Sequence, residues 1–269
     1  MISLPLYKKM LTKNGILFWS FAAVIIFYLG TIILSFAAFD ALAADEEAWE
    51  AFTEFMALFG YDIGLWTDAL LYTSEMFFGV TIYMFLMVLF IILAFRLGYK
   101  VVDNGSLGAY LNAGISRTKY LNTAATCLLT KVFILHALVF LVGIICFAIL
   151  GNEFSALNYL NLVLMTMMVM AAVIFVSFFF GVVFAGRKLA AGLLIAVPVG
   201  LLFLLLMSAL HESIEFLRWL SIFGWFNHME VAAGSRYLWW LLALGGYVAV
   251  IAVAWVASVL IFKRKNLSL

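Results

Sequence analysis

Long apolar runs separated by short polar stretches dominate this chain. Six of them have about the 20 residues without charge that a helix needs to cross the hydrocarbon core of a bilayer. They are residues 16–39, 76–95, 132–151, 160–184, 189–210 and 237–262. Backbone groups in lipid must be paired internally, and the alternation typical of membrane strands is not seen, so these runs predict helices. We therefore expect an all-α polytopic membrane protein, with residues 1–269 forming a single transmembrane domain.

The residues before the first run have an amphipathic pattern. Within 4–14, apolar positions cluster beside Lys8, Lys9 and Lys13, and Pro5 suits the first turn of a helix. This pattern predicts an elbow helix lying in the membrane interface. The alternative is a plain basic flank of the first span.

An acidic stretch, residues 40–75, separates the first two apolar runs. Trp49, Phe52, Met56 and Phe59 recur within it at the spacing of a helix face. Acidic residues fill the start of this pattern, where they suit the helix dipole. We expect a surface helix packed on the mouth of the bundle. Its carboxylates admit a calcium or catalytic interpretation as well as that of a solvated face.

The stretch 96–131 is long for a connection between spans and carries helix-capping signals. An Asn-Gly-Ser sequence can start a short helix over 107–112, and Gly114 can end it. Ser116 can then cap a second helix, 117–130, that continues into the third span. A short helix bounded by glycines suits contact with a cytoplasmic partner, whereas a plain re-entry loop is the alternative.

Composition excludes several classes of protein. The chain is 68% hydrophobic and 11% charged, with a mean hydropathy of +1.19, so a water-soluble fold could not bury its apolar surface. A net charge of +1 gives no basic field for nucleic acid. Cys127 and Cys146 form neither a disulfide framework nor a metal-binding spacing.

Charge asymmetry predicts the orientation. With the N-terminus placed in the cytoplasm, all but two of the 15 Lys and Arg residues fall in inner segments, the exceptions being Arg218 and Arg236. Asp103 is the only one of the 14 acidic residues on that side. The positive-inside rule therefore predicts that both ends of the chain face the cytoplasm.

These features together resemble the permease subunits of ABC transporters of the ABC-2 (type V exporter) class. The resemblance covers the elbow, the six spans, an aromatic outer segment at 217–226 and a short basic tail. It also covers an inner stretch that reads Asp103-Asn-Gly105-Ser-Leu107-Gly-Ala-Tyr110-Leu111, then Gly114-Ile-Ser116-Arg117. Many members carry Glu at position 103 and Pro before the Ile-Ser-Arg step, so Asp103 and Gly114 depart from the pattern.

The resemblance implies a partner that supplies energy. Two permease halves, identical or not, would pair in the membrane, and each would dock a separate ABC ATP-binding subunit. The inner helix would be the coupling helix, and the residues expected there are Asp103, Gly105, Leu107, Tyr110, Leu111 and Arg117. This chain has no Gly-x-x-x-x-Gly-Lys-Ser/Thr loop, so we expect no catalytic residue and no cofactor on it. ATP and Mg would sit on the partner subunit.

A pairing surface is expected on the fifth span. Gly192, Ala196 and Gly200 form a small-xxx-small stripe that lets two helices approach closely. In the family, helices 1 and 5 line the contact between halves, with the substrate path between them. The first span contributes three polar candidates for that face, Ser20, Tyr28 and Thr31. Packing inside one bundle is the alternative for the stripe.

Several polar residues invite other interpretations. His211 and Glu215 stand at i, i+4 and His228 follows, but the zinc-helix pattern needs a second His at the fifth position, so we expect no metal site. Lys131 is expected to reach toward the inner surface, and His136 to be a packed histidine or a proton relay. An ion-coupled carrier and an intramembrane protease are the rival functions. They are disfavoured because the expected spans contain no acidic residue and His136 is their only histidine.

The sequence encodes the substrate weakly. Apolar walls and an aromatic outer mouth suit a hydrophobic or amphipathic cargo. Permeases of this size resemble exporters of peptides, toxins or antimicrobials, which we favour over small drugs or sugar chains. The resemblance places the chain in the plasma membrane of a bacterium as a multi-pass protein.

Overall fold

The computed structural model describes residues 2–58, 63–187 and 189–264. In these residues no strand occurs, and six helices are long and apolar enough to cross a membrane. These helices cover Gly15–Ala43, Val80–Asp103, Arg117–Leu150, Ala156–Val183, Leu189–Ser208 and Tyr237–Arg264. The prediction of an all-α polytopic membrane protein is confirmed.

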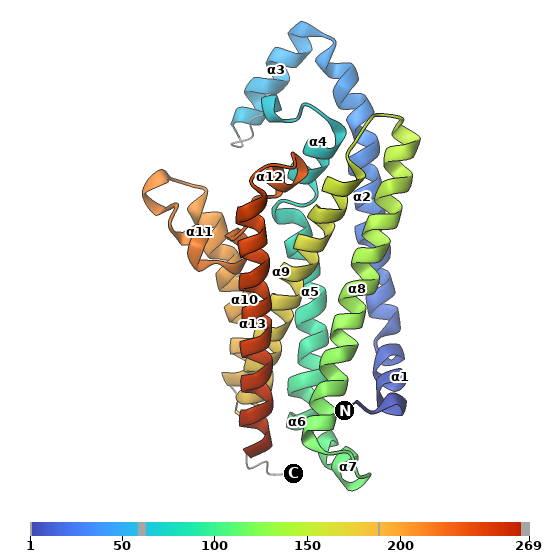
Figure 1. Cartoon of the computed structure of the whole chain (residues 1–269), viewed down its shortest axis with the longest axis vertical. Coiled ribbons are helices and arrows are strands. Elements are labelled where there is room, and N and C mark those ends of the chain that lie inside the picture. The colour runs from blue at the N-terminus through green and yellow to red at the C-terminus, as the bar shows by residue number, and fades with distance from the viewer. Residues whose placement is uncertain (1, 59–62, 188, 265–269) are drawn as a thin grey trace.

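The long helices carry the labels used in Figure 1. They are α2 (Gly15–Ala43), α5 (Val80–Ala94), α8 (Arg117–Leu150), α9 (Ala156–Val183), α10 (Leu189–Ser208) and α13 (Tyr237–Arg264). α5 continues through a π-helical turn, η2 (Phe95–Tyr99), into α6 (Lys100–Asp103), which completes the second span. The shorter helices are α1 (Leu4–Lys13), α3 (Glu46–Ala57), η1 (Ile63–Leu65), α4 (Ala69–Met76), α7 (Ser106–Asn112), η3 (Glu212–Ile214), α11 (Leu217–Leu220), η4 (Ile222–Gly224) and α12 (His228–Ala232).

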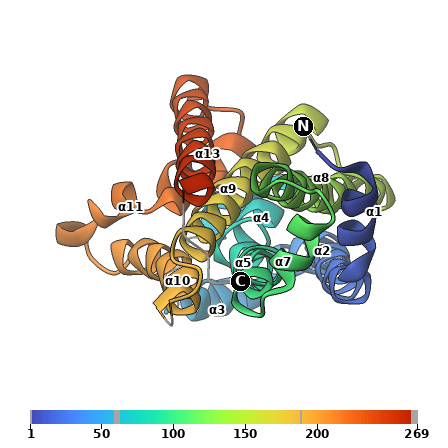
Figure 2. The same cartoon turned by 90° about the horizontal axis from the view of Figure 1, so that it is seen from below.

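α9 is the central helix of the bundle. It packs against α5, α8, α10 and α13, and 72% of its most apolar window is buried, against 17% for α13. Seen from below, α9 crosses the middle of the molecule while α10 and α13 stand apart at its edge (Figure 2). The two edge helices therefore expose apolar sides that only lipid or another protein can cover.

The two ends of the bundle differ in charge. α1, α6 and α7 lie at one end with the N-terminus, and α3 and α4 lie at the other (Figure 1). The first is called the basic end here because its α1 carries Lys8, Lys9 and Lys13. The second is called the acidic end, because α3 begins with Glu46 and Glu47 and is capped by Asp45. The fold thus keeps the separation of charge that the orientation prediction uses.

The second span begins and ends later than the sequence predicted. Its expected bounds were 76–95, but α4 ends at Met76 and the span runs over Val80–Asp103. Gly79 separates the two helices, and a Cβ at this position would lie against the backbone oxygen of Glu75. The later end follows from the π-helical turn, which carries the helix past Arg96. The apolar run in the sequence ends at Arg96, whereas the backbone hydrogen bonding of the helix continues through this residue.

The other spans differ less from their expected bounds. α8 begins at Arg117 because the helix expected over 117–130 and the third span form one unbroken helix. The elbow expected over 4–14 is a separate helix, α1, with Leu6 and Met10 buried. At the acidic end Trp49 and Phe52 of α3 pack against the ring of Phe39. Phe59, expected on the same face, lies outside the described residues.

Candidate functional site

The short helix α7 at the basic end is held between two glycines. Gly105 before it and Gly114 after it have φ of +71° and +79°, a left-handed conformation that residues with a Cβ rarely adopt. Asn104 accepts a hydrogen bond from the backbone N–H of Ser106 at 3.1 Å, which supports the first turn. Ser116 in turn caps α8 by accepting from Lys119 N–H at 3.2 Å. These local signals produce a helix, a tight turn and a second helix.

α7 has a buried side and an exposed side. Leu107 is 0% exposed, and Tyr110 and Leu111 are half-buried. We expected Leu107 to contact a partner, but it has no free surface to offer one, because it packs into the core of its own chain. The exposed side consists of Ala109 and Asn112.

Tyrosines attach this region to the bundle. Tyr120 of α8 donates a hydrogen bond to the backbone oxygen of Leu97 at 2.9 Å, inside the π-helical turn. The ring of Tyr110 lies 5.5 Å from that of Tyr120. Tyr99 donates to the carboxylate of Asp103 at 3.0 Å, and that aspartate is exposed. The region is therefore anchored to both the second and the third span. Arg117, the last of the residues expected there, is half-buried in the first turn of α8.

The elbow helix α1 is fixed to the same part of α8. Lys131 donates a hydrogen bond to the backbone oxygen of Leu11 at 2.9 Å, and its ammonium lies 4.6 Å from the centre of the Phe18 ring. Tyr7 adds a hydrogen bond to Thr130 at 2.9 Å. Lys131 reaches the elbow helix at the basic end, but its side chain does not reach water, because it is only 2% exposed. It is covered by α1 and hydrogen-bonds a carbonyl near that helix's C-terminus, where a cation is favoured.

The small-residue stripe on α10 points away from the chain's own core. Gly192, Ala196 and Gly200 are all exposed. A Cβ placed on Gly192 or Gly200 would meet no atom of the described residues within 4 Å. Packing inside this bundle, one of the two interpretations of the stripe, is therefore excluded.

The candidate residues of α2 fall on different sides of that helix. Ser20 and Thr31 are exposed, on a face with Val24 and Phe27. Tyr28 is half-buried and donates a hydrogen bond to the backbone oxygen of Met76 at 3.4 Å. In the view from below, α5 lies between α2 and α10 (Figure 2), and it contacts both. Ser20 and Thr31 are thus on an exposed side of α2, and Tyr28 belongs to the packing between α2 and the segment before α5.

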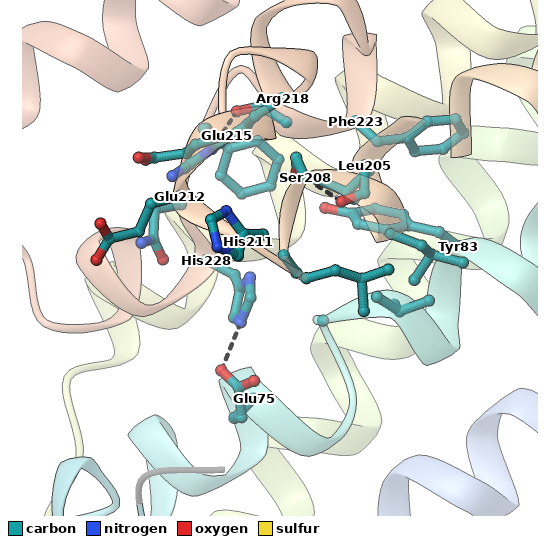
Figure 3. A pocket seen from close by; sticks show the side chains of 18 residues that line it. Glu75, Tyr83, Leu205, Ser208, His211, Glu212, Glu215, Arg218, Phe223 and His228 are labelled. Carbon is teal, nitrogen blue, oxygen red and sulfur yellow. Dashed lines mark hydrogen bonds and ion pairs between the residues drawn. The ribbon is translucent and has the colours of Figure 1, made fainter. Parts of the chain in front are cut away.

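A cavity of about 580 Å³ opens at the acidic end, between the start of α5 and the end of α10 (Figure 3). We call it the outer cavity. Its lining includes Glu75, Tyr83, Leu205, His211, Glu212, Glu215, Arg218, Phe223 and His228. Sequence analysis singled out His211, Glu215 and His228 but did not predict that they share a cavity. Among the described residues no three His, Cys, Asp or Glu side chains are grouped so that they could hold a metal ion.

An ion pair joins two outer segments at the wall of this cavity. His228 of α12 donates from Nε2 to the carboxylate of Glu75 of α4 at 2.8 Å, across 153 positions of sequence. This hydrogen bond lowers the pKa of the Glu75 carboxyl below its ordinary value, although partial burial acts in the opposite direction. Ser74 and Met229 make a second contact between the same helices at 2.9 Å. The pair therefore ties the segment before the second span to the segment before the sixth.

His136 lies in the interior of the bundle. It is 3% exposed, its Nδ1 is 2.9 Å from the backbone oxygen of Val132, and its Nε2 has no hydrogen-bond partner among the residues that the structure describes. Of the two interpretations, the structure favours a packed histidine. A relay needs a second polar group in reach, and within the described residues Nε2 has no hydrogen-bond partner.

No signal within a short window of sequence marks the contacts of Lys131 or the tie between Glu75 and His228. Each depends on residues that are distant along the chain and become neighbours only in the folded bundle. No family model, characterised protein or solved structure matches this chain.

Proposed function

We propose that this chain is the transmembrane permease subunit of an ATP-driven exporter of the ABC-2 class. In this proposal it spans the plasma membrane of a bacterium with its basic end in the cytoplasm. Two such halves, identical or not, pair in the membrane, and each docks an ABC ATP-binding subunit that holds ATP and Mg. The chain itself supplies the path and is not an enzyme.

The observation that carries the proposal is the construction of α7. It is a separate short helix at the basic end, set between two left-handed glycines, with its apolar side anchored and Ala109 and Asn112 exposed. Small exposed side chains let a partner's groove approach the helix backbone closely. The tyrosine contacts described above fix α7 to the bundle. A displacement of α7 by the partner would therefore be transmitted to the spans.

The proposed transmission runs through α8. This helix has 34 residues, so it is about 50 Å long at 1.5 Å per residue. It begins at Arg117, directly after the short connection 113–116 that follows α7. Lys131 and Tyr7 attach α1 to it, so α1, α7 and α8 would respond to the partner as one unit. ATP drives such a cycle only if the ATP-bound partner binds one conformation of this unit better than another.

The proposed path lies along the surface of α2, α5 and α10. The exposed stripe of α10 suits close contact with the second half. The exposed residues Met84 and Val88 of α5 would face the space between the halves. Such apolar walls suit a hydrophobic or amphipathic cargo, and we favour a peptide, toxin or antimicrobial.

The docking proposal is tested by placing a charge on the exposed side of α7. Ala109→Asp adds a desolvated carboxylate to the proposed interface, and we expect it to weaken binding of the ATPase about tenfold or more, about 1.4 kcal/mol. The measurement is the amount of ATP-hydrolysing subunit that co-purifies with the tagged chain from its native membranes. Ala51→Asp is the matched control, because Ala51 is an exposed alanine on α3 at the other end.

Two results would contradict the proposal. One is a wild-type chain that is purified from its own membranes without any ATP-binding subunit. The other is labelling of a cysteine placed at the exposed Asn112 by a membrane-impermeant reagent added outside intact cells, because α7 would then face away from ATP.

A further inference from the structure

The outer cavity separates polar from apolar side chains. Figure 3 shows Glu75, Glu212 and the two histidines on one side and Tyr83 and Phe223 on the other. Tyr83 is 3% and Phe223 2% exposed, and their ring centres are 5.3 Å apart. The two rings form the floor of the cavity, contributed by α5 and η4, but they pack on each other and leave almost no surface open to a ligand.

Hydrogen bonds hold η4, on one side of the floor, to two of the long helices. Ser221, next to η4, donates a hydrogen bond to the backbone oxygen of Leu201 in α10 at 2.6 Å. Tyr247 of α13 donates to the backbone oxygen of Ile222 at 3.0 Å. A preformed floor spares a ligand the cost of ordering its site.

The charges of the lining favour a cation. Three carboxylates, Glu75, Glu212 and Glu215, face one guanidinium, that of Arg218. Within the described part of the chain the ion pairs are His228 with Glu75 and Arg236 with Glu230, so Glu212 and Glu215 have no basic partner. Arg218 lines the cavity as well, and its Nε donates to the backbone oxygen of Gly224 at 2.8 Å.

The same residues exclude two other ligands. A divalent metal needs several ligands grouped around one point, and no such group occurs among the described residues. An anion would meet the excess of carboxylates. Carboxylates without a basic partner beside an apolar wall suit an organic cation, whose charge is attracted to the acids while its apolar part leaves water.

We propose that the outer cavity binds an organic cation with an apolar body, that is, an amphipathic amine or onium ion. The cationic centre lies near Glu212 and Glu215, and the apolar body rests on the apolar side chains of the cavity wall, Leu205, Leu206 and Leu210. This inference rests on the proposed function as an exporter. In that function the outer cavity is the last binding site that the cargo meets on its way out of the cell. Binding itself needs no ATPase, so its test is separate from that of the proposed function.

The test compares two ions of nearly equal size and opposite charge. Binding of labelled tetraphenylphosphonium and tetraphenylborate is measured by equilibrium dialysis on the full chain in phosphatidylcholine nanodiscs, with empty nanodiscs subtracted. We expect saturable binding of tetraphenylphosphonium and at least tenfold weaker binding of tetraphenylborate. Equal binding of the two ions, or no saturable binding of the cation, would overturn the proposal.

Variants then locate the site. Glu212→Gln with Glu215→Gln should weaken tetraphenylphosphonium binding about tenfold, and Ala209→Trp should abolish it by filling the cavity, which Ala209 lines. All three positions are exposed, so the bundle should keep its fold. The matched control is Glu50→Gln with Glu54→Gln, two exposed acids of α3. Binding that survives the first two variants, or that falls equally in the control, refutes the assignment.

Discussion

The ion pair between Glu75 and His228 joins α12 to α4. We predict that its removal increases the frequency of local unfolding of α12. Nε2 and the carboxylate oxygen are 2.8 Å apart, and the two side chains are 24% and 28% exposed. Hydrogen bonds to charged groups contribute about 1.5–3 kcal/mol, and well-exposed ion pairs about 0–1 kcal/mol. For this partly solvated pair we expect about 1–2 kcal/mol. Contacts from Ser74 and Asn158 still hold α12 in the variant, so the helix should loosen without unfolding.

The pH dependence of the tie follows from the pKa of Glu75. Its hydrogen bond with His228 lowers the folded-state pKa below the ordinary value of 4.5. The stabilisation is therefore fully present above that ordinary value. It is lost as the pH falls through the lower pKa of the folded state, when the carboxylate is protonated. Neighbouring charged groups in the cavity, Glu212, Glu215 and Arg218, are unchanged in the variant and act equally on both proteins.

The assay is hydrogen–deuterium exchange of the α12 amides, in a cycle of Glu75→Gln, His228→Ala and the double variant. At about pH 7 each single variant should exchange about 5- to 30-fold faster, which corresponds to 1–2 kcal/mol. The double variant should be no faster than the singles. After correction for intrinsic exchange, acidification below pH 4.5 should open α12 in the wild type and not in Glu75→Gln. Additive single effects, or the same acid response in both proteins, would refute the reasoning.

Three further predictions follow from the bundle. Gly200→Leu should lower the dimeric fraction measured by single-molecule photobleaching severalfold. Gly245→Leu, at an equally open glycine of α13, should not lower it. Equal dimeric fractions in the two variants would show that α10 does not form the pairing surface. Lys131→Met should loosen α1 by about 1–3 kcal/mol, since it removes the bond to the carbonyl of Leu11, and amide exchange of α1 should rise at least fivefold. Leu107→Ala should cost about 2–5 kcal/mol because it empties a fully buried site, and a thermal midpoint equal to that of wild type would contradict that packing.

The sequence alone determined which segments cross the membrane and where the short inner helix begins and ends. Hydropathy is a property of consecutive residues, so the six spans could be predicted. The bounds failed most clearly in the second span, which begins after Gly79 and is carried past Arg96 by a π turn. Capping is also local. Gly105, Gly114 and Ser116 therefore indicated the ends of α7 and the start of α8 before any contact was known.

The tertiary structure decided what each helix faces. An exposed and a buried residue of a membrane helix are both apolar, so hydropathy could not tell that Leu107 is covered and that the stripe of α10 is open. Hydropathy also could not predict that Glu75 contacts His228. Nor could it predict that the rings of Tyr83 and Phe223 share a cavity with carboxylates that have no basic partner, because these neighbours come from different helices. Local interactions select the helices, and only the packing of one helix on another creates a cavity and fixes the chemistry of its walls.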